Sequence, residues 1–399
     1  MYQEHHLYKL LAQDETWLIE TRRRIHQNPE LSEGEHETQK FIEDVLDSLG
    51  IQHEKIADTG VLAVVTGKGG TGNVVGIRAD IDALPIQEPE FKPYASKNKG
   101  VMHACGHDAH TTILLGTLKY LKEHESQWGG TVKGFFQPAE ETVGGADRMV
   151  QEGCMDNPKV DYVIGLHVMP YLEVGEIETR EGKLNAASDS FKIAVRGKAA
   201  HGAYPEKGVD AINIAAQVVT GINGIMSRQI SPLNQAVITV GQIHGGVKNN
   251  ILCDEVVLSG MMRTTDEVTR KDLKQRVERL AVAISEGNGG HAEVSFREGY
   301  QALINDIPVA RKVKALAASV LGNEHVYEKE APSLGVEDFS FFLDRAPGAF
   351  YHLGCGNQSK EISSALHTEQ FEIDETCLTV GVFLQSLITL DLLMRGDMK

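Results

Sequence analysis

The segment Met102-His103-Ala104-Cys105-Gly106-His107-Asp108 contains two side chains that could hold a metal ion. Cys105 and His107 stand two residues apart, so both can point to one spot from a loop. Thiolate and imidazole are ligands for soft and borderline metals such as zinc. Alone the pair decides little, because a Cys-x-His pair is more often a buried cysteine beside an ordinary histidine.

Two adjacent carboxylates, Glu140 and Glu141, follow the apolar stretch 132–136, which we expect to be a buried strand. The carboxyl end of a strand is where α/β sheets build their sites. Because neighbouring side chains point in different directions, one carboxylate could bind a metal while the other faces a reacting water. The ordinary alternative is a solvated acidic loop.

Two histidines also follow expected strands: His167 after the stretch 160–166, and His367 after the stretch 348–353 and a polar loop. Such loops gather at one edge of a parallel sheet, so their side chains can converge. Five protein ligands exceed what one catalytic ion takes, and suit two ions roughly 3.5–4 Å apart that share a water. The expected ligands are Cys105, His107, Glu141, His167 and His367. Glu140, beside a ligand, is left as the general base.

The elements that must position these residues alternate between strands and helices. Buried strands are expected at 74–77, 132–136 and 160–166, and helices at 42–49, 114–121, 308–321 and 375–394. This alternation favours an α/β domain with a mostly parallel sheet.

Residues 186–300 show a different and complete pattern. Strands are expected at 190–195, 236–243, 255–263 and 292–296, with amphipathic helices at 209–222 and 273–284. The order β-α-β-β-α-β is that of a ferredoxin-like sandwich. We therefore expect a catalytic domain over 1–185 and 300–399, and an inserted domain over 186–299.

Composition limits the partners. The formal charge of −17 over 399 residues argues against nucleic acid and anionic membranes. We expect no signal peptide and no apolar run long enough to cross a bilayer. The five cysteines are odd in number and scattered, so no disulfide framework is expected. These features together predict a cytoplasmic protein.

A series of motifs in order resembles the two-metal amidohydrolases that include aminoacylases, hippurate hydrolases and indole-acetyl-amino-acid hydrolases. The resemblance covers almost the whole chain. Its motifs are Arg24-Ile25-His26-Gln27-Asn28-Pro29-Glu30-Leu31, Arg78-Ala79-Asp80-Ile81-Asp82-Ala83-Leu84-Pro85, His103-Ala104-Cys105-Gly106-His107-Asp108, Gln137-Pro138-Ala139-Glu140-Glu141, His201-Gly202-Ala203, Glu337-Asp338-Phe339 and Leu366-His367. It implies the same ligands and general base, and an inserted dimerisation lid.

The resemblance also implies roles that spacing does not show. Asp80 looks like the buried carboxylate that orients a ligand, and His201 like the residue that polarises the scissile carbonyl from a neighbouring subunit. Asn250 and Arg263 look like the groups that hold the substrate's free carboxylate. The implied enzyme is a homodimer that uses two zinc, manganese or nickel ions to release an amino acid from an N-acetyl, benzoyl or similar derivative.

Departures and alternatives concern the substrate more than the chemistry. Glu206, Cys253 and Val336 stand where the family often has histidine, proline and a small residue. A dipeptidase or aminopeptidase-like metallopeptidase with the same centre stays open. Rivals of other classes are a cysteine-nucleophile amidase that uses Cys105 with His107, and a non-catalytic metal-binding relative.

Overall fold

Two separate hydrophobic cores form in the computed structural model, which describes residues 2–89 and 92–394. The first unit contains the described residues of Met1–Gly182, Ile304–Glu330 and Asp338–Lys399. The second unit contains Lys183–Leu303 and Ala331–Glu337. The segment Ala331–Glu337 therefore clusters with the inserted unit, although it lies outside the 186–299 range expected from the sequence.

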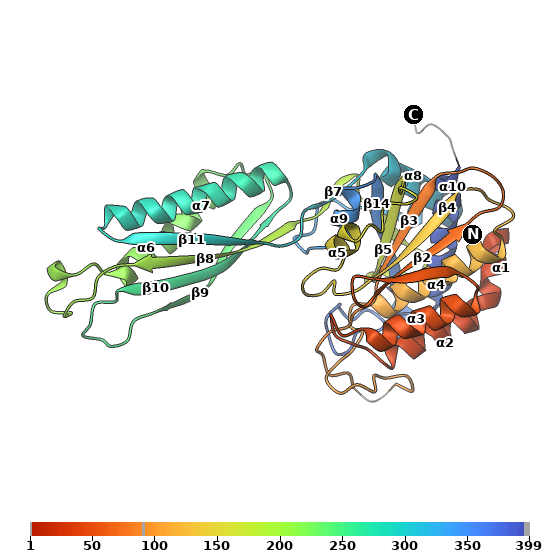
Figure 1. Cartoon of the computed structure of the whole chain (residues 1–399), viewed down its shortest axis with the longest axis horizontal. Coiled ribbons are helices and arrows are strands. Elements are labelled where there is room, and N and C mark those ends of the chain that lie inside the picture. Colours follow the sequence, from red (N-terminus) through yellow and green to blue (C-terminus); the bar gives the residue numbers. More distant parts are fainter. Residues whose placement is uncertain (1, 90–91, 395–399) are drawn as a thin grey trace. The chain divides into compact units, whose positions relative to one another are not determined.

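In the described part of the first unit, eight strands form a mixed sheet in the order β1-β2-β4-β3-β5-β14-β6-β13 (Figure 1). The central run β4-β3-β5-β14 is parallel, as the sequence pattern predicts. These strands are apolar on both faces, which is typical of a sheet covered by helices on both sides. The strands are β1 (Gln52–Ile56), β2 (Gly60–Thr66), β3 (Val74–Asp80), β4 (Thr131–Gln137), β5 (Tyr162–Glu173), β6 (Ile177–Thr179), β13 (Val326–Glu328) and β14 (Gly348–Gly356).

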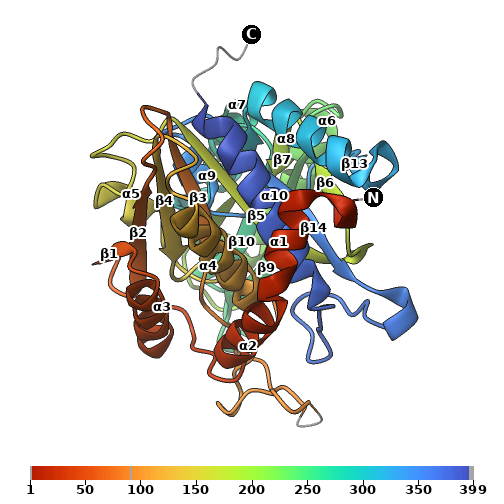
Figure 2. The same ribbon diagram turned by 90° about the vertical axis from the view of Figure 1, so that its right-hand side faces the viewer.

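Helices cover both faces of this sheet. In Figure 2, helices α1, α2, α4 and α10 lie in front of it, and α2, α4 and α10 pack against one another. On the opposite face Phe342 of α9 stacks on Phe135 of β4, with ring centroids 5.1 Å apart. The helices are α1 (His6–Leu11), α2 (Glu15–His26), α3 (His36–Ser48), α4 (His107–Glu123), α5 (Ala146–Gln151), α8 (Ile307–Leu321), α9 (Ser340–Leu343) and α10 (Thr376–Leu393).

Helix α10 is long and apolar enough to cross a membrane by length and composition, so the expectation of no such run is wrong. In the structure 78% of this segment is buried inside the protein. A helix that is apolar all round is what the centre of a large core requires. Here α10 lies against α4 and β14, and its burial explains its composition.

The second unit has the order β8-α6-β9-β10-α7-β11, so the ferredoxin-like pattern is confirmed. Its four strands are antiparallel in the order β11-β8-β10-β9, and both helices contribute to one core. Asp210 and Asp266 cap α6 and α7 through their side-chain oxygens. The elements are β8 (Ala187–Arg196), α6 (Ala211–Arg228), β9 (Ala236–Gly245), β10 (Glu255–Thr264), α7 (Glu267–Gly287) and β11 (His291–Glu298); the short strands β7 (Gly182–Asn185) and β12 (Leu303–Asn305) pair with each other.

Candidate metal centre

Gly106 shapes the turn that leads into α4. Its φ is +87°, and a Cβ atom there would lie 2.3 Å from a methyl group of Val168, so only glycine fits. The turn puts His107 at the first position of α4 and Cys105 just before it. Both side chains are buried. The i, i+2 spacing therefore brings thiol and imidazole to one place, as the sequence predicts.

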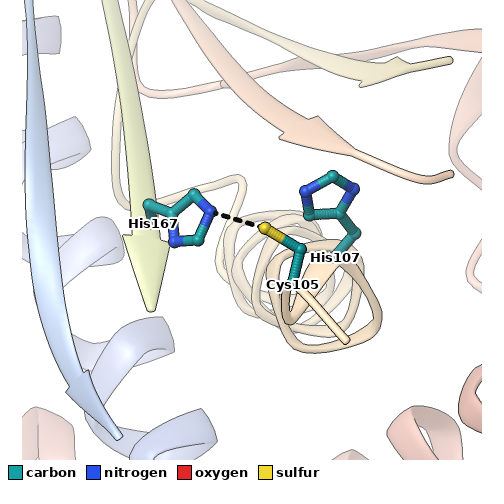
Figure 3. Close-up of side chains that lie close together, drawn as sticks. All are labelled: Cys105, His107 and His167. Atoms are coloured by element: carbon teal, nitrogen blue, oxygen red, sulfur yellow. Dashed lines mark hydrogen bonds between the residues drawn. The ribbon is translucent and has the colours of Figure 1, made fainter. Parts of the chain in front are cut away.

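The five predicted ligands converge in the first unit. The Sγ atom of Cys105 lies 3.3 Å from Nε2 of His167 and 3.2 Å from Nε2 of His367 (Figure 3 draws the first contact). Oε1 of Glu141 lies 3.3 Å from Nε2 of His367 and 3.9 Å from Nε2 of His107.

Ligand atoms form overlapping groups that could hold two ions. Within each group the atoms lie within 4.8 Å of one another: Cys105, His107 and His167; Cys105, Glu141 and His367; and His107, Glu140 and Glu141. Cys105, His107 and Glu141 each belong to two of these groups, so the groups share side chains that could serve either ion. Glu140 is adjacent to the centre, as expected of a general base.

His167 lies inside β5 rather than on a loop after it, which corrects the expected end of that strand at 166. The partner β3 pairs with β5 only as far as Gly165, while β14 continues to pair with it up to Glu173. The part of β5 beyond Gly165 is thus hydrogen-bonded to β14. His167 still lies beyond the last residue paired with β3, and so at the edge of the sheet where the other ligands lie.

Hydrogen bonds orient the histidines toward the centre. Nδ1 of His107 contacts the backbone oxygen of Asp82 at 2.9 Å and its carboxylate at 3.2 Å, and Nδ1 of His167 contacts the carbonyl of Val168 at 2.8 Å. With Nδ1 donating in this way, Nε2 of each ring is free to bind a metal.

Two buried atoms at the centre have no hydrogen-bond partner among the described residues: Nε2 of His107 and Oε1 of Glu141. Buried polar atoms are nearly always paired, so an unpaired nitrogen and oxygen that face each other indicate a place for a cation. Thiolate, imidazole and carboxylate together suit a divalent ion such as zinc. The residues present therefore fit a metal centre.

The electrostatics of the site favour a positive charge. Burial acts to lower the pKa of His107, but Asp80, Asp82 and Glu141 outweigh it and raise this pKa to about 10. Burial raises the pKa of the Cys105 thiol well above its ordinary value, and Glu141 and Glu140 raise it further. Without a bound metal ion such a thiol is neutral and a poor nucleophile, which argues against the cysteine-amidase alternative, whereas a bound cation would favour the thiolate as a ligand.

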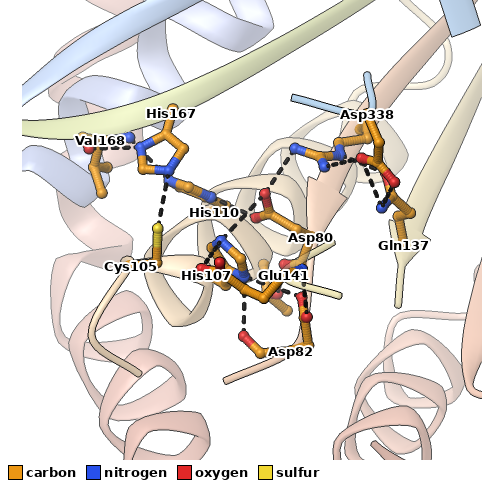
Figure 4. Close-up of polar contacts among 12 residues, drawn as sticks. Asp80, Asp82, Cys105, His107, His110, Gln137, Glu141, His167, Val168 and Asp338 are labelled. Atoms are coloured by element: carbon orange, nitrogen blue, oxygen red, sulfur yellow. Dashed lines mark hydrogen bonds and ion pairs between the residues drawn. The ribbon is translucent and has the colours of Figure 1, made fainter. Parts of the chain in front are cut away.

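Asp80 is predicted to orient a metal ligand, and its hydrogen bonds are to Arg78 and His110 (Figure 4). Its carboxylate accepts hydrogen bonds from Arg78 at 2.7 Å and from Nδ1 of His110 at 2.5 Å, and lies 3.5 Å from Nε2 of His107. The other ring nitrogen of His110 accepts from the Val168 amide at 2.9 Å, so both nitrogens of His110 are engaged.

The carboxylate that holds Nδ1 of His107 is that of Asp82, a residue for which the sequence predicts no role. Its other oxygen accepts from the Ser32 hydroxyl at 2.7 Å and from the Glu141 amide at 3.0 Å. Asp82 thus links a ligand histidine to the backbone of a ligand glutamate. The available signal was the alternation in Arg78-Ala79-Asp80-Ile81-Asp82, which gives both aspartates the same side of an extended chain.

The remaining predicted residues belong to the second unit. His201 and Asn250 are exposed and adjacent: the Gly202 amide donates to the Asn250 carbonyl at 2.8 Å. Arg263 lies near the other end of β10, where it pairs with Ser188, and its guanidinium donates to the carbonyl of Met262 at 3.1 Å. Burial lowers the pKa of this guanidinium.

Residues 76–389 match the model of the peptidase family M20/M25/M40. The chain belongs to this family. It is 41% identical over 365 residues to N-acetyl-L-cysteine deacetylase of Bacillus subtilis, covering 91% of this chain and 85% of the relative. It is 39% identical over 382 residues to thermostable carboxypeptidase 2 of Saccharolobus solfataricus, covering 94% and 95%. The predicted resemblance is confirmed, and the chain is a hydrolase.

A solved M20 structure supports the same conclusion about the metal centre. The Bacillus subtilis YXEP protein, described as a dinuclear metal-binding peptidase, superposes with a TM-score of 0.83 at 33% identity, covering 96% of this chain and 99% of that one. A paired metal centre is therefore described for one structural relative of this M20 chain. The overlapping ligand groups around Cys105 supply the donors for such a pair.

Proposed function

We propose that this M20 hydrolase cleaves the amide bond of N-acyl amino acids with two divalent ions held by Cys105, His107, Glu141, His167 and His367. The observation that carries the proposal is the convergence of these five side chains around two buried, unpaired ligand atoms. The relative named N-acetyl-L-cysteine deacetylase supports an N-acyl amino acid as substrate.

Each protein group has a definite task in this reaction. When bound, a pair of divalent ions polarises the scissile carbonyl and lowers the pKa of a shared water. Glu140 takes the proton from the attacking water and delivers it to the leaving amine. Asp82 holds Nδ1 of His107 and the amide of Glu141, which fixes the geometry around them. His201 donates a hydrogen bond to the developing oxyanion.

We assign the catalytic chemistry to the first unit and lid and dimerisation functions to the second. Strand β9 is an edge strand, and exposed apolar side chains lie on and beside it, with Ile243 54% and Val247 85% exposed. An unpaired edge with apolar side chains is readily covered by a second copy of itself. The proposed assembly is therefore a homodimer formed through the second unit.

The geometry of β10 supports a site shared between two subunits. Glu255 pairs with Arg196 at one end of the strand, and Arg263 pairs with Ser188 near the other. Eight residues of extended chain span roughly 26 Å, so Asn250 and Arg263 of one chain are too far apart to hold one carboxylate. The strand partner of Arg263, Ser188, lies only a few residues after the chain enters the second unit. We therefore propose that Arg263 serves the active site of its own subunit. His201 and Asn250 serve the active site of the partner subunit.

A peptidase activity at the same centre is the second candidate. The relative named thermostable carboxypeptidase 2 favours it. A dipeptide also carries a terminal carboxylate beside the scissile amide, so Arg263 would bind it in the same way. The two activities differ only in the acyl group.

Zinc, manganese and nickel are the proposed metals, since a thiolate favours zinc while imidazole and carboxylate also suit the others. All five cysteines are free and buried, which fits the reducing cytoplasm as the proposed compartment. Fractionation of cells that express the protein would test the location.

The activity is tested by prolonged chelation followed by addition of each metal to a panel of N-acyl amino acids and dipeptides. We expect chelation to abolish hydrolysis and one or more of zinc, manganese and nickel to restore it. Amidation of the substrate's carboxylate should lower kcat/KM by about 10- to 100-fold, the scale of one charge-assisted contact. Full activity in a verified metal-free preparation, or equal turnover of acid and amide, would contradict the proposal.

A further inference from the structure

The loop that carries Glu140 and Glu141 contains a residue in an unusual conformation. Ala139 has a φ of +57° and is fully buried. An L-residue in the left-handed region costs about 1 kcal/mol or more, so surrounding contacts must hold it there. Its carbonyl accepts a hydrogen bond from the Gly144 amide at 2.9 Å. The conformation turns the chain directly before the two catalytic-site glutamates.

The amide of Ala139 is held by a carboxylate from outside the loop. Oε1 of Glu35 accepts from this N–H at 2.8 Å, and Oε2 accepts from the Thr59 hydroxyl at 2.7 Å. Glu35 is fully buried and immediately precedes α3. Thr59 is buried as well, so both ends of this contact lie in the interior.

The position of this carboxylate is itself well supported. The Gln39 amide of α3 donates to the carbonyls of Asp58 and Gly60 at 2.9 Å, which joins the helix to the turn that carries Thr59. The Glu35 carbonyl accepts from the Gln39 backbone amide at 2.8 Å. The carboxylate is thus presented by a helix and a turn that are bonded to each other.

We infer that Glu35, supported by Thr59, is a positioning residue that fixes the Ala139 turn and thereby directs Glu140 and Glu141 into the metal centre. The inference rests on the proposed function, in which Glu140 is the base and Glu141 a ligand. Glu35 acts only through the backbone. Asp82 holds the next but one amide, that of Glu141, at 3.0 Å, so two carboxylates secure the loop on either side of Glu140.

Three substitutions test this role. Glu35→Ala removes the acceptor, and Glu35→Gln keeps one oxygen for the Ala139 amide. Glu30→Ala is the matched control, because Glu30 accepts from the Thr38 amide at 2.8 Å and from its hydroxyl at 2.9 Å at the start of the same helix. Glu30 has no such bond to the 137–141 loop, so its loss tests destabilisation of α3 alone.

We expect Glu35→Ala at saturating metal to lower kcat by about 10²-fold with KM changed much less, the cost of a misplacement of about 1 Å. Glu35→Gln should recover kcat to within about tenfold of the wild type, and Glu30→Ala should stay within about threefold. Thermal unfolding is measured on all three. Wild-type kcat in Glu35→Ala, or an equal loss in Glu30→Ala, would overturn the inference.

A readout that needs no substrate separates this inference from the proposed function. In the cobalt-loaded protein, Glu35→Ala should alter the visible absorption of the metal and weaken cobalt binding about 10- to 100-fold, the scale seen when support of a ligand is lost. Glu30→Ala should change neither. This result would stand even if the chain hydrolysed none of the tested substrates, whereas unchanged cobalt spectra and affinity would overturn the positioning role.

If Glu35→Ala does not fold, Thr59→Val carries the same test, because it removes only the hydroxyl that supports Oε2. A loss of about threefold to tenfold in kcat is then expected, together with a shifted cobalt spectrum. An unchanged kcat and an unchanged spectrum in folded Thr59→Val would overturn the inference.

Discussion

Each histidine near the metal centre is distinguished by what its ring nitrogens contact. His107 and His167 each use Nδ1 for an anchoring contact and keep Nε2 for the centre. His110, three residues after His107, uses both nitrogens, with Asp80 and with the Val168 amide. Burial lowers the pKa of His103 to about 4, so this ring stays neutral and carries no charge into the site. The four histidines therefore fall into three types: two with Nε2 available to a metal, one with both nitrogens engaged, and one held neutral.

Substitution of Glu140 should lower the rate of catalysis, whereas substitution of Glu141 should lower the amount of bound metal. Glu140→Gln removes the proton acceptor but not a ligand, so we expect it to retain both ions and lose about 10²–10⁴-fold in kcat. Glu141→Gln removes an oxygen that lies 3.3 Å from His367 and 3.9 Å from His107, so we expect reduced metal occupancy. Metal analysis and kinetics on the same preparations check this. Metal loss in Glu140→Gln with full occupancy in Glu141→Gln would exchange the two roles.

The convergence of the five ligands could be predicted from the sequence, because each was expected after a strand or at the start of a helix, and such positions gather at one edge of a parallel sheet. It could not be predicted that Asp82, rather than Asp80, holds Nδ1 of His107. Both occupy alternate positions and share a side of the extended chain. Strand β3 ends at Asp80, and the chain beyond it turns Asp82 toward His107. Only the path of that turn decides which carboxylate holds the ligand.

At the scale of elements, the helices and strands were predictable where a periodic apolar pattern is strong, but the turns between them were not. Ala139 and His367 adopt left-handed backbone conformations that glycine would ordinarily occupy. Their tertiary contacts explain this: Ala139 is held by Glu35, and the His367 amide donates to the Ala104 carbonyl at 2.8 Å. Such contacts join segments far apart in the chain, so local sequence carries no sign of them.

A buried polar cluster joins α2, α4 and the loop after β3 on the side of the first unit near the site. His26 of α2 contacts Asp108 at 2.7 Å and Glu88 at 3.1 Å, and Arg22 contacts Asp108 at 2.7 Å. Burial acts to raise the pKa of Glu88, but His26, the Ser96 amide and Lys92 outweigh it and lower this pKa to about 2. The ionised carboxylate is therefore stabilised by folding.

This cluster predicts an acid-sensitive contribution to stability. Because the pKa of Glu88 is lowered from 4.5 to about 2 in the folded protein, its contribution is present above pH about 4.5 and is lost as the pH falls toward 2. Its upper limit is about 3 kcal/mol. Glu88→Gln should therefore be less stable than the wild type at neutral pH, and the difference should shrink below pH 4.5.

Urea unfolding of both proteins with a chelator present, at several pH values between 7 and 2.5, measures this difference without a contribution from bound metal. Glu20→Gln, on the exposed side of α2, is the control and should follow the wild type throughout. A gap between wild type and Glu88→Gln that stays constant across this range would contradict the assignment.

At the scale of the whole molecule, the length of β10 separates the groups that we propose to bind one substrate. His201 and Asn250 lie beyond the end at which Glu255 pairs with Arg196, and Arg263 lies near the opposite end. The order of elements in the second unit could be predicted from its own periodicity. The proposed dimer could not be predicted in this way, because contacts between two copies would leave no local pattern beyond an exposed strand edge such as β9.

A shared site predicts complementation between two inactive variants. A His201→Ala subunit and a Glu140→Gln subunit, mixed into a heterodimer, combine Glu140 of the first with His201 of the second in one intact site. The other site carries both changes. We therefore expect each variant to be nearly inactive alone and the purified heterodimer to recover about half the wild-type activity, since one of two sites is restored.

The matched control is Arg263→Ala mixed with Glu140→Gln. If Arg263 serves its own subunit, each site in this heterodimer lacks one essential group, so no activity should return. Asn250→Ala, at the same end of the sheet as His201, should complement Glu140→Gln as His201→Ala does. Differently tagged subunits allow heterodimers to be isolated before assay. If verified heterodimers of His201→Ala and Glu140→Gln recovered nothing while Arg263→Ala did complement, the two ends of β10 would have to exchange partners between the subunits.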